Sequence, residues 1–389
     1  MTAAEAPHLT NNAARGAATT RVLFIIYGLQ PAGPELRILE FARGFPATTE
    51  VHVCVVGDDL TMLDEFRKTP AKMAMIPVRR PWTDWGQLRK IARYIRANDI
   101  QVVNTFDLKT LLTALPAKLR LGKRVKLVHN LISLWDGIAE RKRKVIWRAM
   151  QHADVILCNG YAVKDVLIGN RKTRPRVVVV PNGVDCDYFQ PSPSLRASER
   201  TRLGFGDDTF VIGTVANARP VKNVPLLLHT TRRLAERYPH VRLVFVGGGP
   251  QLGAMRELAR NLGIAARVVF TGQLTDVRPL LATFDAFALT SFKEGCPNAL
   301  MQAMAMGIPS MSSTVGEVPH LTEGGRCGLM FDPNDADSFY DVAVRLIDDE
   351  QLRQRLTRDG RARMEEQYAN PRMIRDYVEL YSELRALPR

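Results

Sequence analysis

The chain of 389 residues lacks the features that mark secreted or membrane-spanning proteins. Its five cysteines are scattered and include no C-x-x-C pair, so the pattern indicates neither a disulfide framework nor a zinc site. No apolar run approaches the roughly 20 residues that a membrane span requires. Residues 1–20 are rich in Ala and Thr, without the apolar core of a signal peptide, and we expect a disordered tail there. These absences favour a protein of the reducing cytoplasm.

Acidic residues are also scarce, because 40 Asp and Glu are outnumbered by 54 Lys and Arg, which gives a formal charge of +14. Such a balance favours acidic partners, namely nucleic acid, nucleotide-linked substrates or an anionic membrane surface. No nucleic-acid-binding motif accompanies the charge, so we expect no nucleic-acid partner. With 46% hydrophobic residues over this length, two domains are expected rather than one.

Short apolar runs alternate with amphipathic segments along most of the chain, which predicts an α/β protein with two doubly wound parallel sheets. The first series of alternations occupies residues 21–190 and the second residues 209–370. Between them, residues 191–208 are rich in Pro, Ser, Gly and charge, and we place the interdomain linker there. The last segment, Met373–Leu387, has the wide apolar face of a helix that must dock on another surface.

One stretch, Ser291–Met306, predicts a site for an anion. It follows an apolar run with strand character, and Pro297 opens an apolar helical pattern within it. The first backbone N–H groups of that helix, in the segment from Cys296 to Ala299, would lack intrahelical acceptors, and the helix dipole favours negative charge beside them. A phosphate group would bind well there, flanked by Glu294 before the helix and Gln302 one turn inside it.

Seven short motifs follow one another along the chain. They are Ala32-Gly33-Pro34-Glu35, Pro181-Asn182-Gly183-Val184-Asp185, Arg219-Pro220-Val221-Lys222, Val246-Gly247-Gly248-Gly249-Pro250, Thr271-Gly272 with Asp276-Val277, Glu294-Gly295-x-Pro297-Asn298-Ala299-Leu300, and Val315-Gly316-Glu317-Val318-Pro319. In this order they resemble the retaining glycosyltransferases of family 4, over nearly the whole chain after the tail.

The resemblance implies the GT-B fold, in which two Rossmann-like domains face a deep cleft. Residues 21–190 would form the acceptor domain and residues 209–370 the nucleotide-sugar donor domain. The terminal helix, within residues 371–389, would cross back to the first domain and find its docking surface there.

The resemblance also implies the reaction. A hexosyl group would pass from a UDP- or GDP-linked sugar to a glycan or lipid-linked acceptor, in cell-surface polysaccharide or glycolipid synthesis, with the anomeric configuration kept. Negative charge would grow on the diphosphate, so a fixed cation aimed at it lowers the barrier. Lys222 matches the family motif, and Arg219 is the second candidate, because Asn217 stands where the common family pattern has arginine. Solvation of a surface loop is the alternative role of both cations.

Glu294 matches the first glutamate of the family's Glu-x7-Glu motif, which contacts the donor sugar. Its alternative role is stabilisation of the helix dipole by about 0.5 kcal/mol. The second glutamate of the motif accepts hydrogen bonds from the ribose hydroxyls and is Gln302 here, which still accepts but without charge-assisted strength. The other donor-binding residues that the resemblance implies are Gly33, Asn217, Arg219, Leu274, Gly295, Cys296, Pro297, Asn298 and Ala299.

Neither a metal nor another cofactor is expected. Two D-x-D triplets, at residues 185–187 and 335–337, resemble carboxylate pairs that bind metals, but both lie at segment boundaries, where turn and cap roles are expected. The block Gly247–Gly249 lacks the spacing of a dinucleotide fingerprint and predicts a tight strand-to-helix turn. Lys222, Arg219 and the helix start could carry the phosphate charge without a metal.

His129 follows the strand expected at Val125–Val128, at the carboxyl end that lines the site in open α/β sheets. It is therefore a candidate catalytic residue, with a structural histidine as the alternative. Basic residues at 118–126 and 141–148 are interleaved with apolar ones, among them Trp147. Such a face suits an anionic leaflet, where each charge contributes about 1 kcal/mol, although a solvated face would look the same. We expect a cytoplasmic protein in peripheral contact with the inner face of the cell membrane.

Two other functions stay open at this point. A non-catalytic subunit that binds a nucleotide sugar would fit the glutamine at position 302. A nucleotide-sugar epimerase of the same fold would release an epimer or a free sugar without an acceptor.

Overall fold

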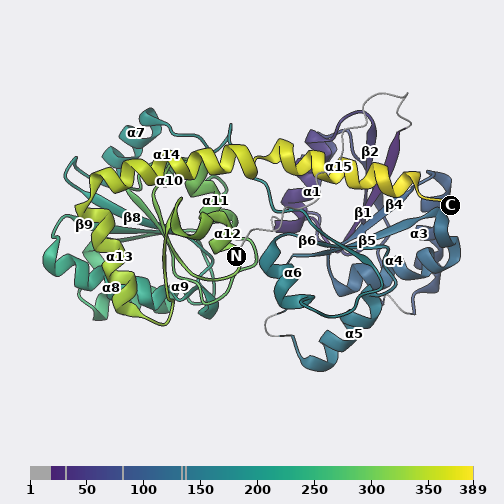
Figure 1. Cartoon of the computed structure of the whole chain (residues 1–389), viewed down its shortest axis with the longest axis horizontal. Coiled ribbons are helices and arrows are strands. Elements are labelled where there is room, and N and C mark those ends of the chain that lie inside the picture. The colour runs from purple at the N-terminus through teal and green to yellow at the C-terminus, as the bar shows by residue number, and fades with distance from the viewer. Residues whose placement is uncertain (1–18, 31–32, 81–82, 133–134, 136–137, 389) are drawn as a thin grey trace. The chain divides into compact units, whose positions relative to one another are not determined.

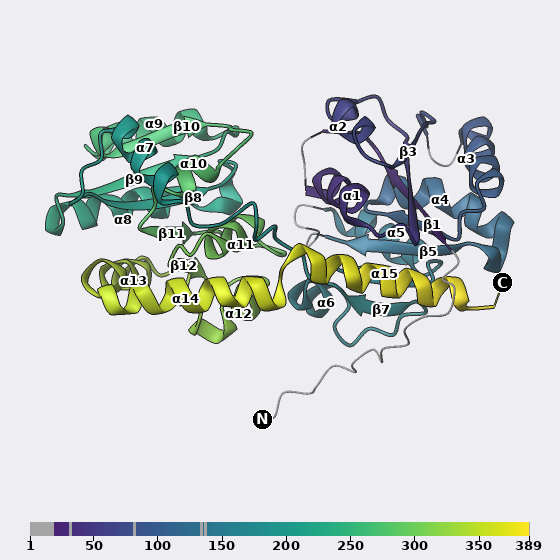
Figure 2. The same cartoon turned by 90° about the horizontal axis from the view of Figure 1, so that it is seen from above.

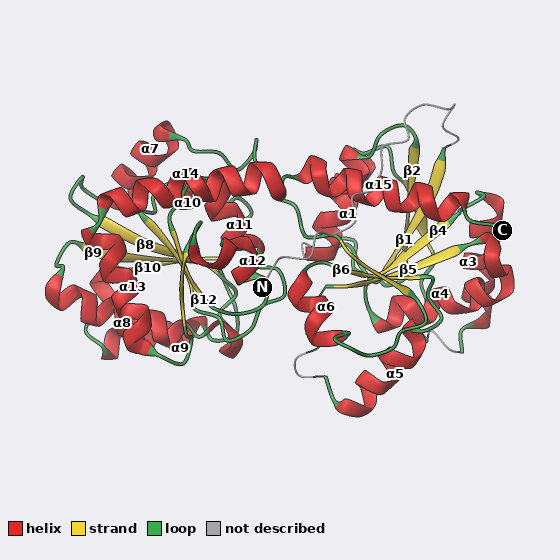
Figure 3. Cartoon of the chain, viewed as in Figure 1, coloured by secondary structure: helices red, strands yellow, loops and turns green. Residues whose placement is uncertain are grey.

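A computed structural model describes residues 19–30, 33–80, 83–132, 135 and 138–388 (Figure 1). Within this part the chain forms two sheets, of seven and six strands, and helices pack against each of them (Figure 3). Every strand pair with a recorded register is parallel. The α/β class with two doubly wound sheets, predicted from the alternation of apolar runs, is confirmed.

The first sheet has the strand order β3-β2-β1-β4-β5-β6-β7. Its strands are β1 (Thr20–Ile26), β2 (Thr49–Val55), β3 (Lys72–Met75), β4 (Val102–Thr105), β5 (Lys126–Leu131), β6 (Val155–Cys158) and β7 (Arg176–Val179). The helices between them are α1 (Gly33–Gly44), α2 (Leu63–Arg67), α3 (Trp85–Ala97), α4 (Leu108–Leu121), α5 (Glu140–Met150) and α6 (Tyr161–Leu167). Strands such as β1 and β4 are buried almost throughout, as expected of a parallel sheet covered on both faces.

The second sheet has the order β10-β9-β8-β11-β12-β13. Its strands are β8 (Phe210–Val215), β9 (Val241–Val246), β10 (Val268–Gly272), β11 (Ala286–Leu289), β12 (Ser310–Ser313) and β13 (Leu329–Phe331). The helices of this part are α7 (Pro193–Leu203), α8 (Val224–Arg237), α9 (Leu252–Asn261), α10 (Arg278–Leu281), α11 (Asn298–Ala305), α12 (Val318–Leu321), α13 (Ala336–Asp348) and α14 (Glu350–Gln367). The order reverses between β8 and β11, and ligands of open α/β sheets bind at such a reversal.

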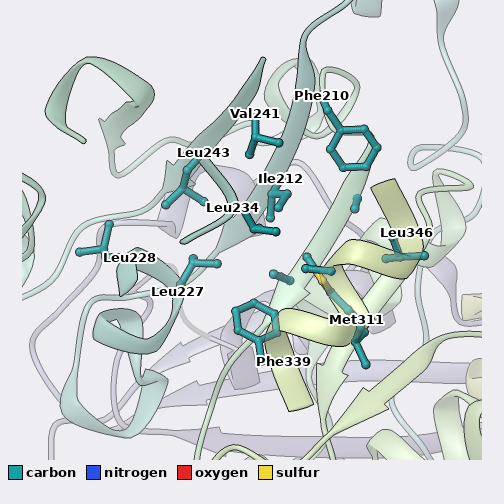
Figure 4. Packing of buried hydrophobic residues seen from close by; sticks show 14 of the residues in the cluster. Phe210, Ile212, Leu227, Leu228, Leu234, Val241, Leu243, Met311, Phe339 and Leu346 are labelled. Carbon is teal, nitrogen blue, oxygen red and sulfur yellow. The ribbon is translucent and has the colours of Figure 1, made fainter. Parts of the chain in front are cut away.

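The core of this second sheet is held by apolar side chains from one face of the strands and from the helices that cover it. Phe210 and Ile212 of β8 belong with Leu227 of α8 and Phe339 of α13 to one buried cluster (Figure 4). Phe339 is fully buried and stacks near Phe331, with ring centroids 4.4 Å apart. This packing fixes the strands whose carboxyl ends carry the candidate site.

In the stretch 191–208, where composition predicts a linker, the structure has the helix α7. Two of its arginines, Arg196 and Arg200, form ion pairs with Asp285 just before β11. Arg200 also donates to the carbonyl oxygens of Gly206 and Thr209. These contacts tie the segment to the second sheet, which a reading of Pro, Ser and charge content alone does not reveal.

The chain divides into two compact units, one of Met1–Val128 with Val378–Arg389 and one of His129–Tyr377. The last helix, α15 (Asn370–Ala386), follows α14 and contributes its second half to the first unit (Figure 2). There Tyr381 is fully buried, and its hydroxyl donates to Oδ1 of Asn104 on β4 at 3.0 Å. The apolar face predicted for Met373–Leu387 thus finds its partner in the first sheet. No helix of the described part is both long and apolar enough to cross a membrane.

Candidate active site

A cavity of about 410 Å³ opens in the second unit at the point where the strand order reverses. Its lining includes the last residues of β8, β9 and β11, namely Val215, Val246 and Leu289. The other residues that line it are Ala216, Asn217, Lys222, Gly247, Gly248, Gln273, Leu274, Val277, Glu294, Cys296, Pro297, Asn298, Ala299 and Gln302. The cavity therefore combines apolar strand ends with a polar rim that holds a cation, a carboxylate and a helix start.

The helix start is that of α11. Pro297 occupies the N-cap position and provides no side-chain cap, while the N–H groups of Leu300 and Met301 bond back to its carbonyl oxygen. Within the described residues, the backbone N–H groups of Asn298 and Ala299 make no hydrogen bond, and both residues line the cavity. Two free donors and the positive end of the helix dipole favour an anion here.

Glu294 is held in place from two sides. Lys222 Nζ lies 2.6 Å from Glu294 Oε1, and Ser291 Oγ donates to the same oxygen at 2.6 Å. The Lys222 and Glu294 side chains are 25% and 11% exposed, so the pair is partly shielded from water. Thr290 Oγ1 donates to the carbonyl oxygen of Lys222, which ties the short helix at Pro220–Lys222 to the end of β11. The sequence pattern brings a fixed cation and a fixed carboxylate to one rim.

Two residues of the glycine block, Gly247 and Gly248, also line the cavity. Gly247 has φ +142°, and a Cβ atom there would lie 1.9 Å from the carbonyl oxygen of Ala216. Gly249 has φ +119°, and its Cβ would lie 2.2 Å from Oδ1 of Asn217. Side chains would clash at both positions, so glycine is required for β9 to turn into α9 this close to the loop after β8. The predicted tight turn is confirmed.

This cavity is lined by most of the residues predicted from sequence to be catalytic, as Lys222 and Glu294 are, or to bind the donor. They are Asn217, Lys222, Leu274, Glu294, Cys296, Pro297, Asn298, Ala299 and Gln302. Gln302 is half-buried in α11, and Leu274 is 40% exposed. Gly295 lies between two lining residues without lining the cavity itself. Arg219 is exposed next to the short helix that carries Lys222 and does not line the cavity either.

Gly33 and His129 belong to the first sheet's elements. Gly33 is the exposed first residue of α1, and a Cβ atom there would meet nothing within 4 Å, so packing inside the protein does not demand glycine. His129 lies inside β5, because that strand continues to Leu131 rather than ending at Val128. Its side chain is 1% exposed, and this burial lowers the pKa of His129 to about 4. The imidazole is therefore neutral at physiological pH.

Several lining residues were not predicted from the sequence. Val215 and Leu289 end apolar runs and look like any other core residue, because a sequence does not show which strands become neighbours. Val246 opens the motif that holds the glycine block, but the sequence does not mark its side chain as part of a site. Gln273 lies next to the predicted Leu274 and carries no local signal of its own. The rule that ligands lie at the carboxyl ends of parallel strands could have found the three apolar residues, had the strand order been known.

Both D-x-D triplets have the predicted turn and cap roles. Asp185 Oδ1 accepts hydrogen bonds from the backbone N–H groups of Asp187 and Tyr188. Asp335 caps α13 by accepting from the N–H groups of Asp337 and Ser338. These bonds orient the carboxylates toward the backbone of their own turns.

Two family models match the chain. Residues 31–188 match the model of "Glycosyltransferase Family 4", and residues 209–349 match that of "Glycosyl transferases group 1". EpsF of Bacillus subtilis (strain 168), a protein assigned to the glycosyltransferases, is 32% identical over 303 residues, which cover 75% of this chain and 79% of that protein. The chain belongs to the family 4 glycosyltransferases. It is thus a glycosyltransferase, as the seven motifs indicated.

Other family 4 relatives and solved structures agree with this assignment. A D-inositol 3-phosphate glycosyltransferase of Corynebacterium jeikeium is 31% identical over 236 residues, which cover 57% of this chain and 56% of that protein. Among solved structures, HepE of Anabaena in complex with UDP superposes with a TM-score of 0.84 at 20% identity, over 94% of this chain and all of that one. The fold of this family 4 glycosyltransferase is GT-B, as predicted.

Proposed function

We propose that this glycosyltransferase moves a hexosyl group from a UDP- or GDP-linked sugar to a glycan or lipid-linked acceptor, with retention of the anomeric configuration. The acceptor would serve cell-surface polysaccharide or glycolipid synthesis. The observation that carries the proposal is that Lys222, Glu294 and the start of α11 line one cavity at the carboxyl ends of the strands, with Lys222 and Glu294 paired. A solved structure of HepE of Anabaena contains UDP-glucose, which supports a nucleotide sugar as the donor.

The charge that develops on the leaving diphosphate would be stabilised by the polar rim of the cavity. The N–H groups of Asn298 and Ala299 are fixed before the reaction begins, and Lys222 is fixed by Glu294, so little reorganisation is needed as charge grows. Arg219 would reach the diphosphate from outside the cavity. With these cations and donors in place, the proposed transfer needs no metal ion and no other cofactor.

Each of the remaining lining residues would contact a different part of the nucleotide sugar. Gln302 would accept hydrogen bonds from the ribose hydroxyls, and Glu294 would contact the hydroxyls of the transferred sugar. Asn217 and Leu274 would lie along the nucleotide, and Gly33 would let the loop before α1 approach the diphosphate. His129 would act on the acceptor side only if its strand moved, because it is buried in this structure.

The first domain, residues 21–190 with the helix of residues 371–389, would hold the acceptor, and residues 209–370 would hold the donor, with residues 191–208 between them. The basic residues of α4 and α5 would bring the enzyme to the anionic inner face of the cell membrane. Arg141 and Lys142, for instance, are exposed on α5. An acceptor anchored in the membrane would then lie near the site.

A thermal-shift screen of nucleoside diphosphates tests the donor site. A nucleotide at 100 times its Kd stabilises the protein by about 2.7 kcal/mol, so a rise in Tm of a few degrees is expected for UDP or GDP. The same nucleotide should shift the Lys222→Ala variant much less. If no nucleoside diphosphate raises the Tm of the wild-type protein, the proposed donor site is wrong. Incubation with the matching nucleotide sugar and mixed acceptors then separates transfer from binding alone, and an epimer formed without acceptor would favour the epimerase.

A further inference from the structure

A second cavity, of about 250 Å³, lies in the first unit between α3 and α4. Four arginines line it, together with Ala92 and Leu121. Arg89, Arg93 and Arg96 come from α3, where spacings of four and three residues place them on one face of the helix, and Arg120 comes from the end of α4. The donor cavity is in the other unit, so this cavity is a separate site.

The four guanidinium groups lack acidic partners in the described part of the chain. Some other arginines of this unit do pair with carboxylates, as Arg21 does with Asp99 and Arg43 with Glu65. Neither α3 nor α4 contains an acidic residue. Of the carboxylates that flank these helices, Asp99 pairs with Arg21 and Asp107 caps α4, whereas the Asp84 side chain makes no cap bond at the start of α3.

Such an arrangement costs stability when the cavity is empty. All four arginines are exposed, and like charges three or four residues apart on one helix face repel each other. A cation at Arg96 or Arg120 benefits from the negative end of its helix dipole, but Arg89 lies near the positive end of α3 and does not. A bound anion would remove this repulsion, since several guanidinium forks can each donate two parallel hydrogen bonds to it.

The size of the cavity and the number of cations indicate which anion fits. A volume of about 250 Å³ far exceeds the roughly 30 Å³ of one liquid water, so a phosphate or diphosphate group has room. Up to four positive charges match a multiply charged ligand better than a single carboxylate. We propose that the cavity formed by Arg89, Arg93, Arg96 and Arg120 binds a phosphate-bearing ligand, at a site distinct from the donor cavity.

The phosphate could belong to a soluble molecule or to a lipid headgroup. Two apolar side chains on the same helices, Trp85 at the start of α3 and Leu119 beside Arg120, are 60% and 70% exposed. Exposed apolar side chains beside arginines are typical of surfaces that touch an anionic leaflet. The chemistry at the guanidinium groups is the same for both sources, so the experiment has an arm for each.

The soluble arm titrates inorganic pyrophosphate into the full-length protein in a calorimeter. The test variant carries Arg93→Gln with Arg96→Gln, and the control carries Arg355→Gln with Arg375→Gln, which removes the same charge from exposed positions of α14 and α15. Because pyrophosphate could also enter the donor cavity, each pair is measured in a Lys222→Ala background as well. We expect the test variant to raise the Kd at least tenfold in both backgrounds and the control to leave it within twofold.

The membrane arm sediments the same proteins with vesicles of phosphatidylcholine alone or with added phosphatidic acid. If the protein binds only the acidic vesicles, and if this binding is lost in the test variant and competed by pyrophosphate, the site binds a lipid headgroup. If the protein binds pyrophosphate but not the vesicles, the site binds a soluble ligand. Equal Kd values for test and control variants, with unchanged vesicle binding, would overturn the proposal. If the test variant does not fold, Arg93→Lys with Arg96→Lys keeps the charge and should still weaken binding severalfold by removing the forks.

Discussion

Glu294 shows how one side chain can serve both the structure and the proposed reaction. Its carboxylate orients Lys222 and accepts from Ser291, yet it lies on the cavity rim rather than in the core. Glutamine at this position keeps the shape and an acceptor oxygen but loses the charge. We therefore expect Glu294→Gln to lower turnover at least a hundredfold, the order of loss seen when one electrostatic group is removed from an active site. Steady-state kinetics with the donor that the thermal-shift screen identifies would measure it.

Two results would separate this role from a structural one. The Tm of Glu294→Gln should stay within a few degrees of the wild type, since both hydrogen-bonding partners keep an acceptor. Glu236→Gln, which breaks an exposed ion pair with Arg232 on α8, should change neither turnover nor Tm. If Glu294→Gln lowers the Tm by many degrees together with turnover, the role of Glu294 is structural.

Gln302 and Asn217 are the two positions at which this chain departs from the family pattern, and Gln302 is the one that would face the ribose. It lies in the second turn of α11 and lines the cavity, and its side chain makes no hydrogen bond with other described residues. A carboxylate there would accept from ribose hydroxyls with about twice the strength of the neutral amide. We expect Gln302→Glu to lower the Kd of the nucleoside diphosphate severalfold and Gln302→Ala to raise it, both by calorimetry. An unchanged Kd in both variants would place the ribose elsewhere.

At the scale of elements, the sequence predicts those helices and strands whose own residues carry the expected apolar pattern and turn signals. β11 and α11 are an example, because an apolar run, a glycine and a Pro-Asn pair follow one another there. The alternation of apolar runs does not reveal β12, because Ser310–Ser313 is mostly polar although every residue in it is buried. A Cβ at Gly328 would lie 2.4 Å from Ser310 Oγ. The small residues of β12 are therefore required by close contact with the neighbouring segment, which no local sequence pattern shows.

The same limit applies to the site. Lys222, Glu294 and Gln302 were predicted because they belong to motifs, and the structure brings them to one cavity. The strand-end residue Val215 belongs to no motif and was not predicted, since its role depends on pairing with Val246, about 30 residues further along the chain. His129 was placed at a strand end by its apolar neighbours, but hydrogen bonding extends β5 by three residues beyond Val128.

The turn between β9 and α9 offers a matched pair of glycines. Gly247→Ala should destabilise the protein by at least about 1–3 kcal/mol, because φ is +142° and a backbone oxygen lies 1.9 Å from the added Cβ. Gly253→Ala in α9 meets nothing within 4 Å and should stabilise it by up to about 1 kcal/mol. Chemical denaturation would measure both. Equal effects of the two substitutions would contradict the strained geometry assigned to Gly247.

At the scale of the whole molecule, the chain forms two sheets by alternating strands and helices, and the second half of its last helix belongs to the first unit. Val378–Arg389 belongs to the first unit although α14 packs on the second, so the two units share a continuous C-terminal segment. Stability of the first unit therefore depends on residues that are added last. The donor cavity, by contrast, is formed by residues 215–302 of the second unit alone.

Tyr381 tests this division. Its ring is fully buried, packs edge-on against Phe45, and its hydroxyl bonds to Asn104. Tyr381→Ala should cost about 3–5 kcal/mol, the usual loss for a large buried aromatic. Hydrogen exchange should then quicken in β1, β2 and β4, whereas β8 and β9 keep their protection and the nucleotide Kd stays within twofold. Glu379→Ala, at an exposed position of the same helix, should change none of these. Equal loss of protection in both sheets would mean that the units unfold together and that the last helix stabilises the molecule as a whole.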